Sequence, residues 1–272
     1  MYLNFYGFKE VPFNLTPNAH FFFESDKHTE ALSVLLYAVN QRKGFVVMTG
    51  EIGSGKTTVC RTLLNHLDTS VESALITNTH ISGKDLLATI LEDLGVEYQP
   101  GSKARLLSQL NHYLICKLKE DKNVVLIIDE AQNLTPSVLE EIRMLSNLET
   151  EQEKLIQIII LGQPELRKKL ALPRLEQLRQ RIAVYYHLDP LTTEEALNYI
   201  RHRLRVASDS DNPYFSDEAL KLIVEFSKGV PRLINQLCDS ALLIGYVRDK
   251  RLIDEEIMRE VIADSPMVRI AA

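Results

Sequence analysis

The chain reads Phe45-Val46-Val47-Met48-Thr49-Gly50-Glu51-Ile52-Gly53-Ser54-Gly55-Lys56-Thr57. The first five residues form an apolar run of the length of a buried strand, and the apolar residues between Thr57 and Leu67 fall on one face of a helix. The glycines between them let the backbone turn its N–H groups inward, as a nest for phosphate oxygens. This stretch therefore predicts a strand, a phosphate-binding loop and a helix in direct succession.

The side chains of this loop have separate expected tasks. Lys56 is placed to reach the β and γ phosphates of a nucleotide, and the Thr57 hydroxyl to bind Mg²⁺, while the positive end of the following helix attracts phosphate. The expected phosphate-binding residues are Gly50, Glu51, Ile52, Gly53, Ser54, Gly55, Lys56, Thr57 and Thr58. A glycine-rich turn with an incidental lysine is the alternative, and the flanking strand and helix signals disfavour it. We expect the chain to bind a nucleoside triphosphate with Mg²⁺.

Bulk composition restricts the class of protein. The chain has 272 residues, 45% of them apolar and 25% charged, as in globular proteins with one large domain or two unequal ones. The net charge of −6 argues against non-specific binding of nucleic acid over the whole surface, yet leaves room for a local basic patch. The three cysteines read as buried thiols of a reducing compartment. No membrane-length apolar run or export signal is present, so a cytoplasmic location is expected.

Strand and helix patterns alternate up to residue 189. Strands are expected at 45–49, 74–77, 124–128, 155–161 and 183–188, and helices at 26–41, 57–67, 104–119, after Ser82 and after Thr135. Ser82 and Asp85 have the spacing of a capping box, which fixes the start of one helix. The alternation predicts parallel βαβ units, and the fully apolar strands predict an α/β fold whose sheet is covered by helices on both faces.

The pattern changes after Pro190, where strand signals stop. Helices are expected near 193–206, 217–228, 231–247 and 254–263, and their expected caps are Thr192 with Glu195, Ser216 and Asp254. The expected division of the chain is therefore a packed, irregular aromatic arm at 1–27, a phosphate-loop core at 28–189, a small helical lid at 190–264 and a flexible end at 265–272.

Polar residues follow two of the expected strands. Asp129 and Glu130 come directly after the apolar run 124–128, at the carboxyl edge of the sheet, where side chains for chemistry gather. Asp129 is expected to hold Mg²⁺ and Glu130 to orient or deprotonate an attacking water, with a solvated acidic turn as the alternative. Gln163 ends the next strand, where its amide either touches the water and the γ-phosphate or is a turn residue ahead of Pro164.

Arginines stand at two further places. Arg179 and Arg181 precede the last strand, and a guanidinium suits phosphate, although surface salt bridging is its usual role. Arg232 falls in the first turn of the expected helix at 231–247, where a cation is unfavourable against the helix dipole. That misfit indicates that Arg232 serves a partner such as a phosphate.

These parts, in this order, resemble those of the AAA+ ATPases. More narrowly, the chain resembles the ExeA type, also called general secretion pathway protein A, and its pilus-biogenesis relatives, over essentially its whole length. The narrower resemblance is carried by Met1–Phe8 with Pro12-Phe13, Asn147–Thr150, Leu161–Leu166 and Leu178–Ile182. The turn at Gly229–Asn235 is shared more widely, including with Holliday-junction motor ATPases and transposition regulators.

The resemblance implies ATP as the nucleotide and a role for each matching residue. These roles are Lys56 and Thr57 for phosphate and Mg²⁺, Asp129 for Mg²⁺, Glu130 for water activation, Gln163 as first sensor, Arg181 or Arg179 as a finger reaching a neighbouring subunit, and Arg232 as second sensor. It also implies that the arm at 1–27 packs near the adenine, with His28 a candidate. Gln163 departs from the Asn or Thr usual in the wider superfamily. ExeA-type proteins usually continue into a membrane span and a peptidoglycan-binding domain, and this chain ends at Ala272 without either.

Three functions remain open at this stage. The first is an ATP-hydrolysing homo-oligomer, ring-like and cytoplasmic or held at the inner membrane face by a partner, that drives assembly of a secretion or pilus envelope complex. The second is an ATP-dependent DNA-binding regulator of the transposition type, suggested by a basic cluster. That cluster consists of Arg167, Lys168, Lys169, Arg174, Arg179 and Arg181, with Arg201, Arg203 and Arg205 added. The third is a nucleotide-gated scaffold with negligible turnover.

Overall fold

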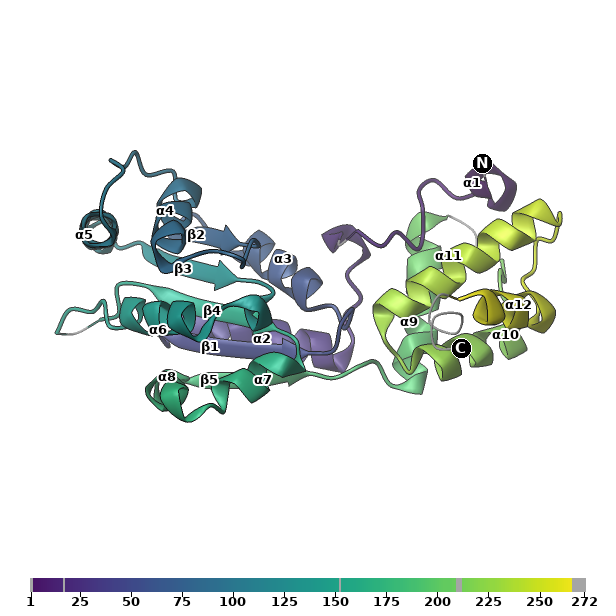
Figure 1. Ribbon diagram of the computed structural model, residues 1–272. Helices are drawn as coiled ribbons and strands as arrows, with labels where there is room; N and C mark the ends of the chain where they lie inside the picture. The colour runs from purple at the N-terminus through teal and green to yellow at the C-terminus, as the bar shows by residue number, and fades with distance from the viewer. Residues whose placement is uncertain (1, 17, 152, 209–211, 266–272) are drawn as a thin grey trace. The chain divides into compact units, whose positions relative to one another are not determined.

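Five parallel strands form the single sheet of the described residues, in the order β2-β3-β4-β1-β5 (Figure 1). The computed structural model describes residues 2–16, 18–151, 153–208 and 212–265. The strands are β1 (Phe45–Gly50), β2 (Val71–Ile76), β3 (Asn123–Ile128), β4 (Gln157–Gly162) and β5 (Val184–Leu188). Because all neighbours pair in parallel, their carboxyl ends lie at one edge, as the sequence predicts.

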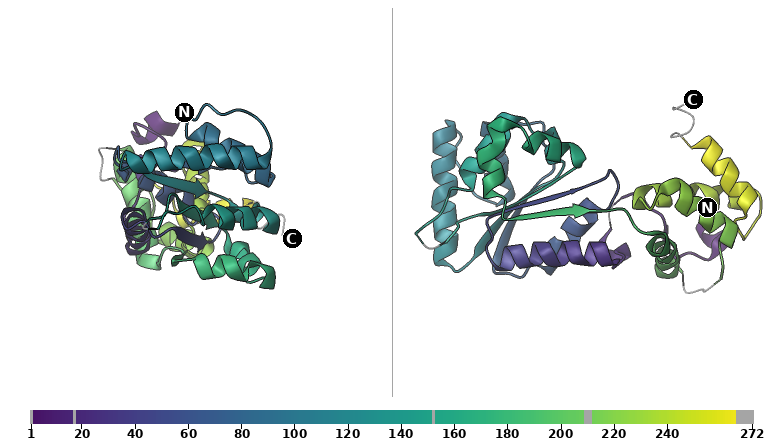
Figure 2. Two further views of the ribbon diagram at one scale, coloured as in Figure 1. Left: turned by 90° about the vertical axis from the view of Figure 1, so that its left-hand side faces the viewer. Right: turned by 90° about the horizontal axis from the view of Figure 1, so that it is seen from below.

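Helices cover both faces of this sheet (Figure 2). They are α2 (Asp26–Asn40), α3 (Lys56–His66), α4 (Gly83–Asp93), α5 (Lys103–Lys119), α6 (Pro136–Leu145), α7 (Pro164–Leu170) and α8 (Glu176–Arg181), with 3-10 turns at η2 (Ala131–Asn133) and η3 (Pro173–Leu175). Strands β1, β3 and β4 are buried along their whole length, as expected for a sheet sandwiched between helical layers.

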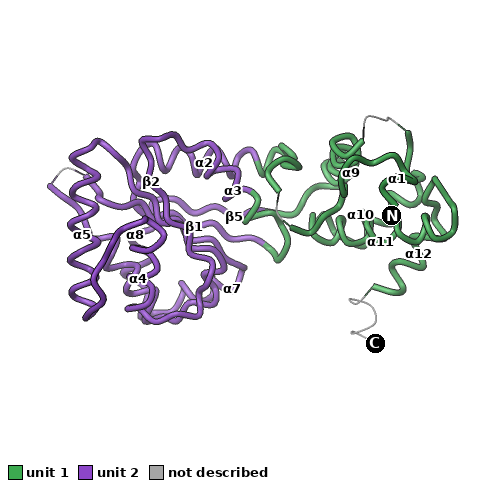
Figure 3. Tube along the Cα trace, turned by 90° about the horizontal axis from the view of Figure 1, so that it is seen from above, with its two compact units in different colours: residues 1–28, 51–58, 189–272 green, residues 29–50, 59–188 purple. Residues whose placement is uncertain are grey.

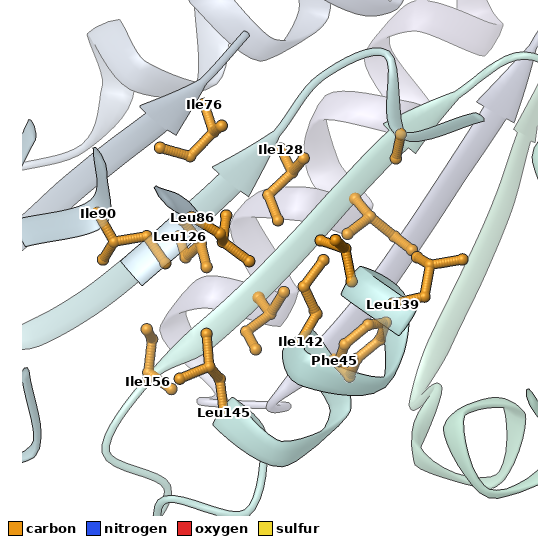
Figure 4. Close-up of a cluster of buried hydrophobic side chains, with 14 of the residues drawn as sticks. Phe45, Ile76, Leu86, Ile90, Leu126, Ile128, Leu139, Ile142, Leu145 and Ile156 are labelled. Carbon is orange, nitrogen blue, oxygen red and sulfur yellow. The ribbon is translucent and has the colours of Figure 1, made fainter. Parts of the chain in front are cut away.

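The larger hydrophobic core lies between one face of the sheet and helices α4 to α8 (Figure 4). Phe45, Leu126 and Ile158 point from three adjacent strands towards this layer, and Leu139 and Ile142 come from α6. All five are 1% exposed or less. Burying one such side chain contributes about 1.5–3 kcal/mol, so this layer keeps the strand ends in fixed register.

Contacts within the chain define two compact units (Figure 3). The sheet unit comprises residues 29–50 and 59–188, and the helical unit comprises 1–28, 51–58 and 189–272. The helical unit contains α1 (Tyr2–Tyr6), η1 (Ala19–Phe21), α9 (Thr193–Ala207), α10 (Asp217–Ser227), α11 (Pro231–Val247) and α12 (Glu255–Asp264). Of the stretch 265–272, only Ser265 lies within the described residues.

The aromatic arm packs into the core of the helical unit. Tyr6 and Phe13 are buried there, and the Tyr6 hydroxyl donates to main-chain oxygens of α11 and of the turn after it, at Leu242 and Lys250. The arm is more regular than the sequence suggests, because it contains α1 and η1. Desolvation raises the pKa of Tyr6 to about 12.

Arg203 does not belong to the exposed basic cluster to which the sequence analysis added it. Its side chain is buried, donates to the Pro12 carbonyl and to the Tyr199 hydroxyl, and lies 4.6 Å over the Phe21 ring. A guanidinium committed to the arm in this way cannot belong to an exposed basic patch. Arg203 therefore joins the arm to α9.

The expected helix starts are observed. Ser82 with Asp85 and Thr192 with Glu195 form complete capping boxes. Ser216 and Asp254 cap α10 and α12 through their side chains. The three cysteines are free thiols, as expected, but Cys116 is half-buried while Cys60 and Cys238 are buried.

Candidate nucleotide site

The loop that follows β1 has the backbone of a phosphate cradle. Gly53 and Gly55 adopt φ values of +78° and +103°, a region that residues with a Cβ rarely enter. The Ser54 N–H donates to the Glu51 carbonyl at 3.1 Å, which closes the turn, and α3 begins at Lys56. Half-buried Thr57 and Thr58 follow in its first turn. The glycines predicted from the sequence are thus where the backbone needs them.

Polar groups of this loop fit a phosphate ligand. Lys56 is only 5% exposed, and its ammonium donates to the Glu51 carbonyl at 2.8 Å. Among the described residues, the buried Ser54 hydroxyl oxygen has no hydrogen-bond partner. A buried cation beside an unsatisfied hydroxyl and a helix N-terminus suits an anion. Glu51 and Ile52, at the tip of the loop, are exposed.

His28 supports this loop from the end of the arm. Its Nε2–H donates to the Ser54 carbonyl at 2.9 Å, which fixes the tautomer, so Nδ1 accepts from the Ser25 hydroxyl at 2.7 Å. Burial lowers the pKa of His28, against smaller opposing effects of the Ser54 bond and the Glu195 charge. Both ring nitrogens are therefore engaged, and a Cβ on Gly55 would meet Nε2 at 2.6 Å. The family resemblance made His28 a candidate near the adenine but did not indicate its contact with the Ser54 carbonyl.

Arg232 contacts the same loop through its main chain. It is the second residue of α11, as expected, and its N–H donates to the Gly53 carbonyl at 3.2 Å. A Cβ on Gly53 would lie 2.4 Å from the Arg232 Cβ, so the two backbones approach closely. The Arg232 side chain is exposed and makes no hydrogen bond or ion pair with the described residues.

In the sheet unit, Asp129 and Glu130 begin a tight acidic turn at the carboxyl end of β3. Asp129 is 4% exposed, and its carboxylate accepts the Glu130 N–H at 2.8 Å. Glu130 has a left-handed φ of +54°, a conformation that few residues other than glycine adopt. This backbone conformation turns the chain from β3 into η2.

Gln163 lies beside this acidic turn. It precedes α7, and its side-chain amide donates to the Glu130 carboxylate at 3.1 Å. The structure thus brings together two of the predicted residues from adjacent strands. Gln132, which the sequence reasoning missed, also contacts the same carboxylate. The sequence signal that could have found Gln132 is its side-chain amide two residues after Glu130.

The arginines before β5 differ in how they are engaged. The Arg179 guanidinium donates to the Leu170 carbonyl at 3.1 Å, and more weakly to the Leu172 carbonyl. Arg181 is exposed at the end of α8, where its charge helps lower the pKa of Glu149, less strongly than the Lys154 hydrogen bond does. Lys169, from the same basic cluster, donates to main-chain oxygens of Gln132 and Leu134.

Comparison with known proteins identifies the fold. A family model described as an AAA domain matches residues 39–170. The chain is 43% identical over 249 residues to General secretion pathway protein A of Aeromonas hydrophila. The chain contains an AAA ATPase domain of the general secretion pathway protein A type. The match covers 91% of this chain but 45% of that protein, so the chain spans less than half of that relative's length.

Two solved structures share the fold at low sequence identity. Cdc6p from Pyrobaculum aerophilum has a TM-score of 0.69 and 16% identity, over 95% of this chain and 70% of that one. The RuvB Holliday junction branch migration motor of Thermotoga maritima has a TM-score of 0.60 and 20% identity, over 88% and 69%. These similarities confirm the predicted parallel-sheet fold with a helical region after it.

Two features are absent from the described part of the chain. No helix there is both long enough and apolar enough to span a bilayer. Within the same residues, no three His, Cys, Asp or Glu side chains are grouped so as to hold a metal ion. A Mg²⁺ bound mainly by one carboxylate, one hydroxyl and nucleotide phosphates needs no such group.

Proposed function

We propose that this chain hydrolyses ATP to ADP and phosphate in the presence of Mg²⁺. The observation that carries the proposal is the loop at 51–58, with its two left-handed glycines, buried Lys56 ammonium and unpartnered Ser54 hydroxyl. Backbone N–H groups and the start of α3 favour phosphate there. An anion that displaces the Glu51 carbonyl from Lys56 would satisfy the lysine with a full opposite charge.

The remaining chemistry is assigned to five side chains. Thr57 and Asp129 would hold Mg²⁺, which neutralises charge on the phosphates when bound. Glu130 serves as the base that orients the attacking water, and Gln163 and Arg232 sense the terminal phosphate. Asp129 suits the metal because its carboxylate is buried at a strand end and already oriented by the Glu130 N–H. In this proposal the arm at 1–27 lies near the adenine. The phosphate-loop core is 28–189, the helical lid is 190–264 and the flexible end is 265–272.

A second copy of the chain would complete the site. Arg181 is assigned as the arginine that reaches a neighbour's nucleotide in a ring-like homo-oligomer. Both arginines are exposed, but the Arg179 guanidinium already donates to the carbonyls of Leu170 and Leu172, whereas the Arg181 guanidinium makes no hydrogen bond with the described residues, so Arg179 is disfavoured. An arginine supplied in this way raises turnover about 10³–10⁵-fold in phosphoryl-transfer enzymes.

The biological setting is proposed from similarity alone. The relative from Aeromonas hydrophila is named for general secretion, so the proposed role is to drive assembly of a secretion or pilus complex of the cell envelope. The free cysteines suit a reducing compartment. The ATPase would act in the cytoplasm or at the inner face of the cytoplasmic membrane, through a partner protein.

Removing the loop lysine tests the ATPase proposal. Lys56→Ala should abolish the thermal stabilisation that Mg-ATP gives the wild-type chain, because the buried cation facing the phosphates is lost. Hydrolysis should fall with it. The exposed Lys84→Ala serves as a matched control that should behave as wild type. Wild-type protein that shows neither stabilisation nor release of phosphate over a wide range of ATP concentrations would rule the proposal out.

The dependence of turnover on protein concentration tests the shared site. Specific activity of wild type should rise steeply with concentration, and Arg181→Ala should lose about 10³–10⁵-fold at the highest concentration. Arg179→Ala should lose much less turnover than Arg181→Ala. Flat specific activity, or a larger loss in Arg179→Ala than in Arg181→Ala, would contradict the assignment.

DNA binding is the alternative, and the structure reduces its support. In the basic cluster on α7, η3 and α8, Lys169 and Arg179 donate to main-chain oxygens. The other members, Arg167, Lys168, Arg174 and Arg181, are exposed. Those exposed cations are the observation in its favour. A mobility shift of duplex DNA that requires ATP and weakens steeply with salt would establish it.

A further inference from the structure

Three side chains form a closed hydrogen-bonded cluster at the carboxyl edge of the sheet. The Gln132 and Gln163 amides both donate to the same carboxylate oxygen of Glu130, Oε2, the second at 3.1 Å. The Gln132 Oε1 oxygen in turn accepts the main-chain N–H of Gln163 at 3.0 Å. Gln132 thus uses both ends of its amide, one on the candidate base and one on the candidate sensor.

The second oxygen of Glu130 is left for another ligand. Its Oε1 atom has no hydrogen-bond partner among the described residues, and the side chain is half-buried rather than sealed. A carboxylate anchored through one oxygen has a defined direction for the lone pairs of the other. That is the arrangement that a base requires if it must receive a proton from one particular position.

The backbone beneath the cluster is held by side chains from two other segments, α7 and the loop after β2. Lys169, near the end of that helix, donates to the carbonyls of Gln132 and Leu134, the second at 2.7 Å. Thr79 donates to the Glu130 carbonyl at 3.2 Å from the loop after β2. With its main chain fixed in this way, the turn presents Gln132 from a set position, so the amide and not the backbone decides where the carboxylate points.

We propose that Gln132 is a positioning residue for Glu130. It anchors Oε2 so that Oε1 faces the attacking water, and it keeps that anchor when the Gln163 amide leaves to contact the terminal phosphate. Two donors on one oxygen make this exchange feasible, because the carboxylate never loses both. The inference rests on the proposed ATPase function, in which Glu130 is the base and Gln163 the sensor.

Two substitutions at Gln132 separate its donor from its acceptor. Gln132→Met removes both, and Gln132→Glu keeps an acceptor for the Gln163 N–H while removing the donor to Glu130. Both should lower kcat about 10- to 100-fold, since a misdirected catalytic group costs about that much, while the dissociation constant for Mg-ATP stays within about twofold. The exposed neighbour gives the control Asn133→Met, which should match wild type.

The outcomes distinguish the inference from its alternatives. Gln132→Glu with wild-type kcat would show that only the support of Gln163 matters, and would overturn the inference. So would a loss of ATP affinity as large as the loss of kcat. In the Glu130→Gln background, Gln132→Met should cause no further loss, because its effect acts through the carboxylate. A wild-type chain without turnover would instead disprove the ATPase proposal.

A measurement without nucleotide checks the cluster itself. In protein carrying ¹⁵N in its glutamine side chains, Glu130→Ala should shift the side-chain amide signals of both Gln132 and Gln163. Gln109, which bonds to the remote Gln99, should not move. Unchanged Gln132 and Gln163 signals would show that the cluster is absent in solution, whatever the activity of the chain.

Discussion

The phosphate loop and the acidic turn are stabilised by different kinds of contact. In the loop, the Lys56 ammonium, the His28 ring and the Arg232 N–H all donate to main-chain carbonyls. In the acidic turn, two side-chain amides donate to a side-chain carboxylate. The phosphate loop is thus defined by the conformation of its backbone. The acidic turn is defined by side-chain hydrogen bonds, and its main chain is held by Thr79 and Lys169.

This difference determines how each region responds to substitution. A backbone cradle depends on residues that allow unusual φ values, so it is damaged by adding atoms where glycines stand. A side-chain cluster depends on particular donors and acceptors, so it is damaged by removing them while the fold persists. The first kind of damage should reduce binding of ATP, and the second should reduce turnover.

The largest expected effect is in the acidic turn. Glu130→Gln should reduce turnover about 10²–10⁴-fold, because an amide cannot accept the proton of the attacking water. Binding of Mg-ATP should survive, since the loop is untouched. Turnover by rapid quench and affinity by calorimetry measure the two separately. Normal hydrolysis by this variant would mean that the base lies elsewhere.

An added methyl group tests the loop. In Gly55→Ala, a Cβ would lie 2.6 Å from the His28 Nε2 at a φ of +103°, so the cradle must shift. Strain of about 1–3 kcal/mol predicts a loss of ATP affinity of about 5- to 150-fold. Gly95→Ala is the matched control, with a φ of +67° but no atom within 4 Å of the new Cβ. Equal affinities in the two variants would refute the backbone-cradle account.

The smallest expected effect is a pH dependence of stability at His28. Burial depresses its native pKa below the unfolded value of about 6.5, so the native state prefers the neutral ring. This contribution is complete above about pH 6.5 and decreases as the pH falls towards the native pKa, by at most about 1.4 kcal/mol per pH unit.

His28→Gln keeps a donor near the Nε2 position without the titration. Its free energy of unfolding, measured by denaturant at pH 7.5 and at pH 5.5, should therefore decline less between the two pH values than that of wild type. Identical declines would show that protonation of His28 is not coupled to folding.

Periodicity and caps in the sequence predicted most of the fold. The apolar runs of β1, β3 and β4 and the capping residues Ser82 and Thr192 are local signals, and the structure reproduces them. The start of β2 was missed by three residues: the strand begins at Val71, where half-exposed polar residues obscure the apolar pattern.

The candidate site was predictable only where it is local. The phosphate loop and the pair Asp129 and Glu130 can be recognised from the spacing of neighbouring residues. Gln132 and Gln163, in contrast, are 31 residues apart, and only the pairing of β3 with β4 brings them together. Arg203 is bonded to Pro12, which is 191 residues away in the sequence, and the residues next to Arg203 gave no signal of this contact. Contacts between distant segments need the three-dimensional fold.

Residues 51–58 belong by their contacts to the helical unit, although β1 enters them and α3 leaves them within the sheet unit (Figure 3). Within the helical unit, the Arg232 N–H joins the start of α11 to the Gly53 carbonyl. A displacement of α11 would therefore strain the loop that we propose binds phosphate, so the position of this helix and the affinity for nucleotide are expected to change together.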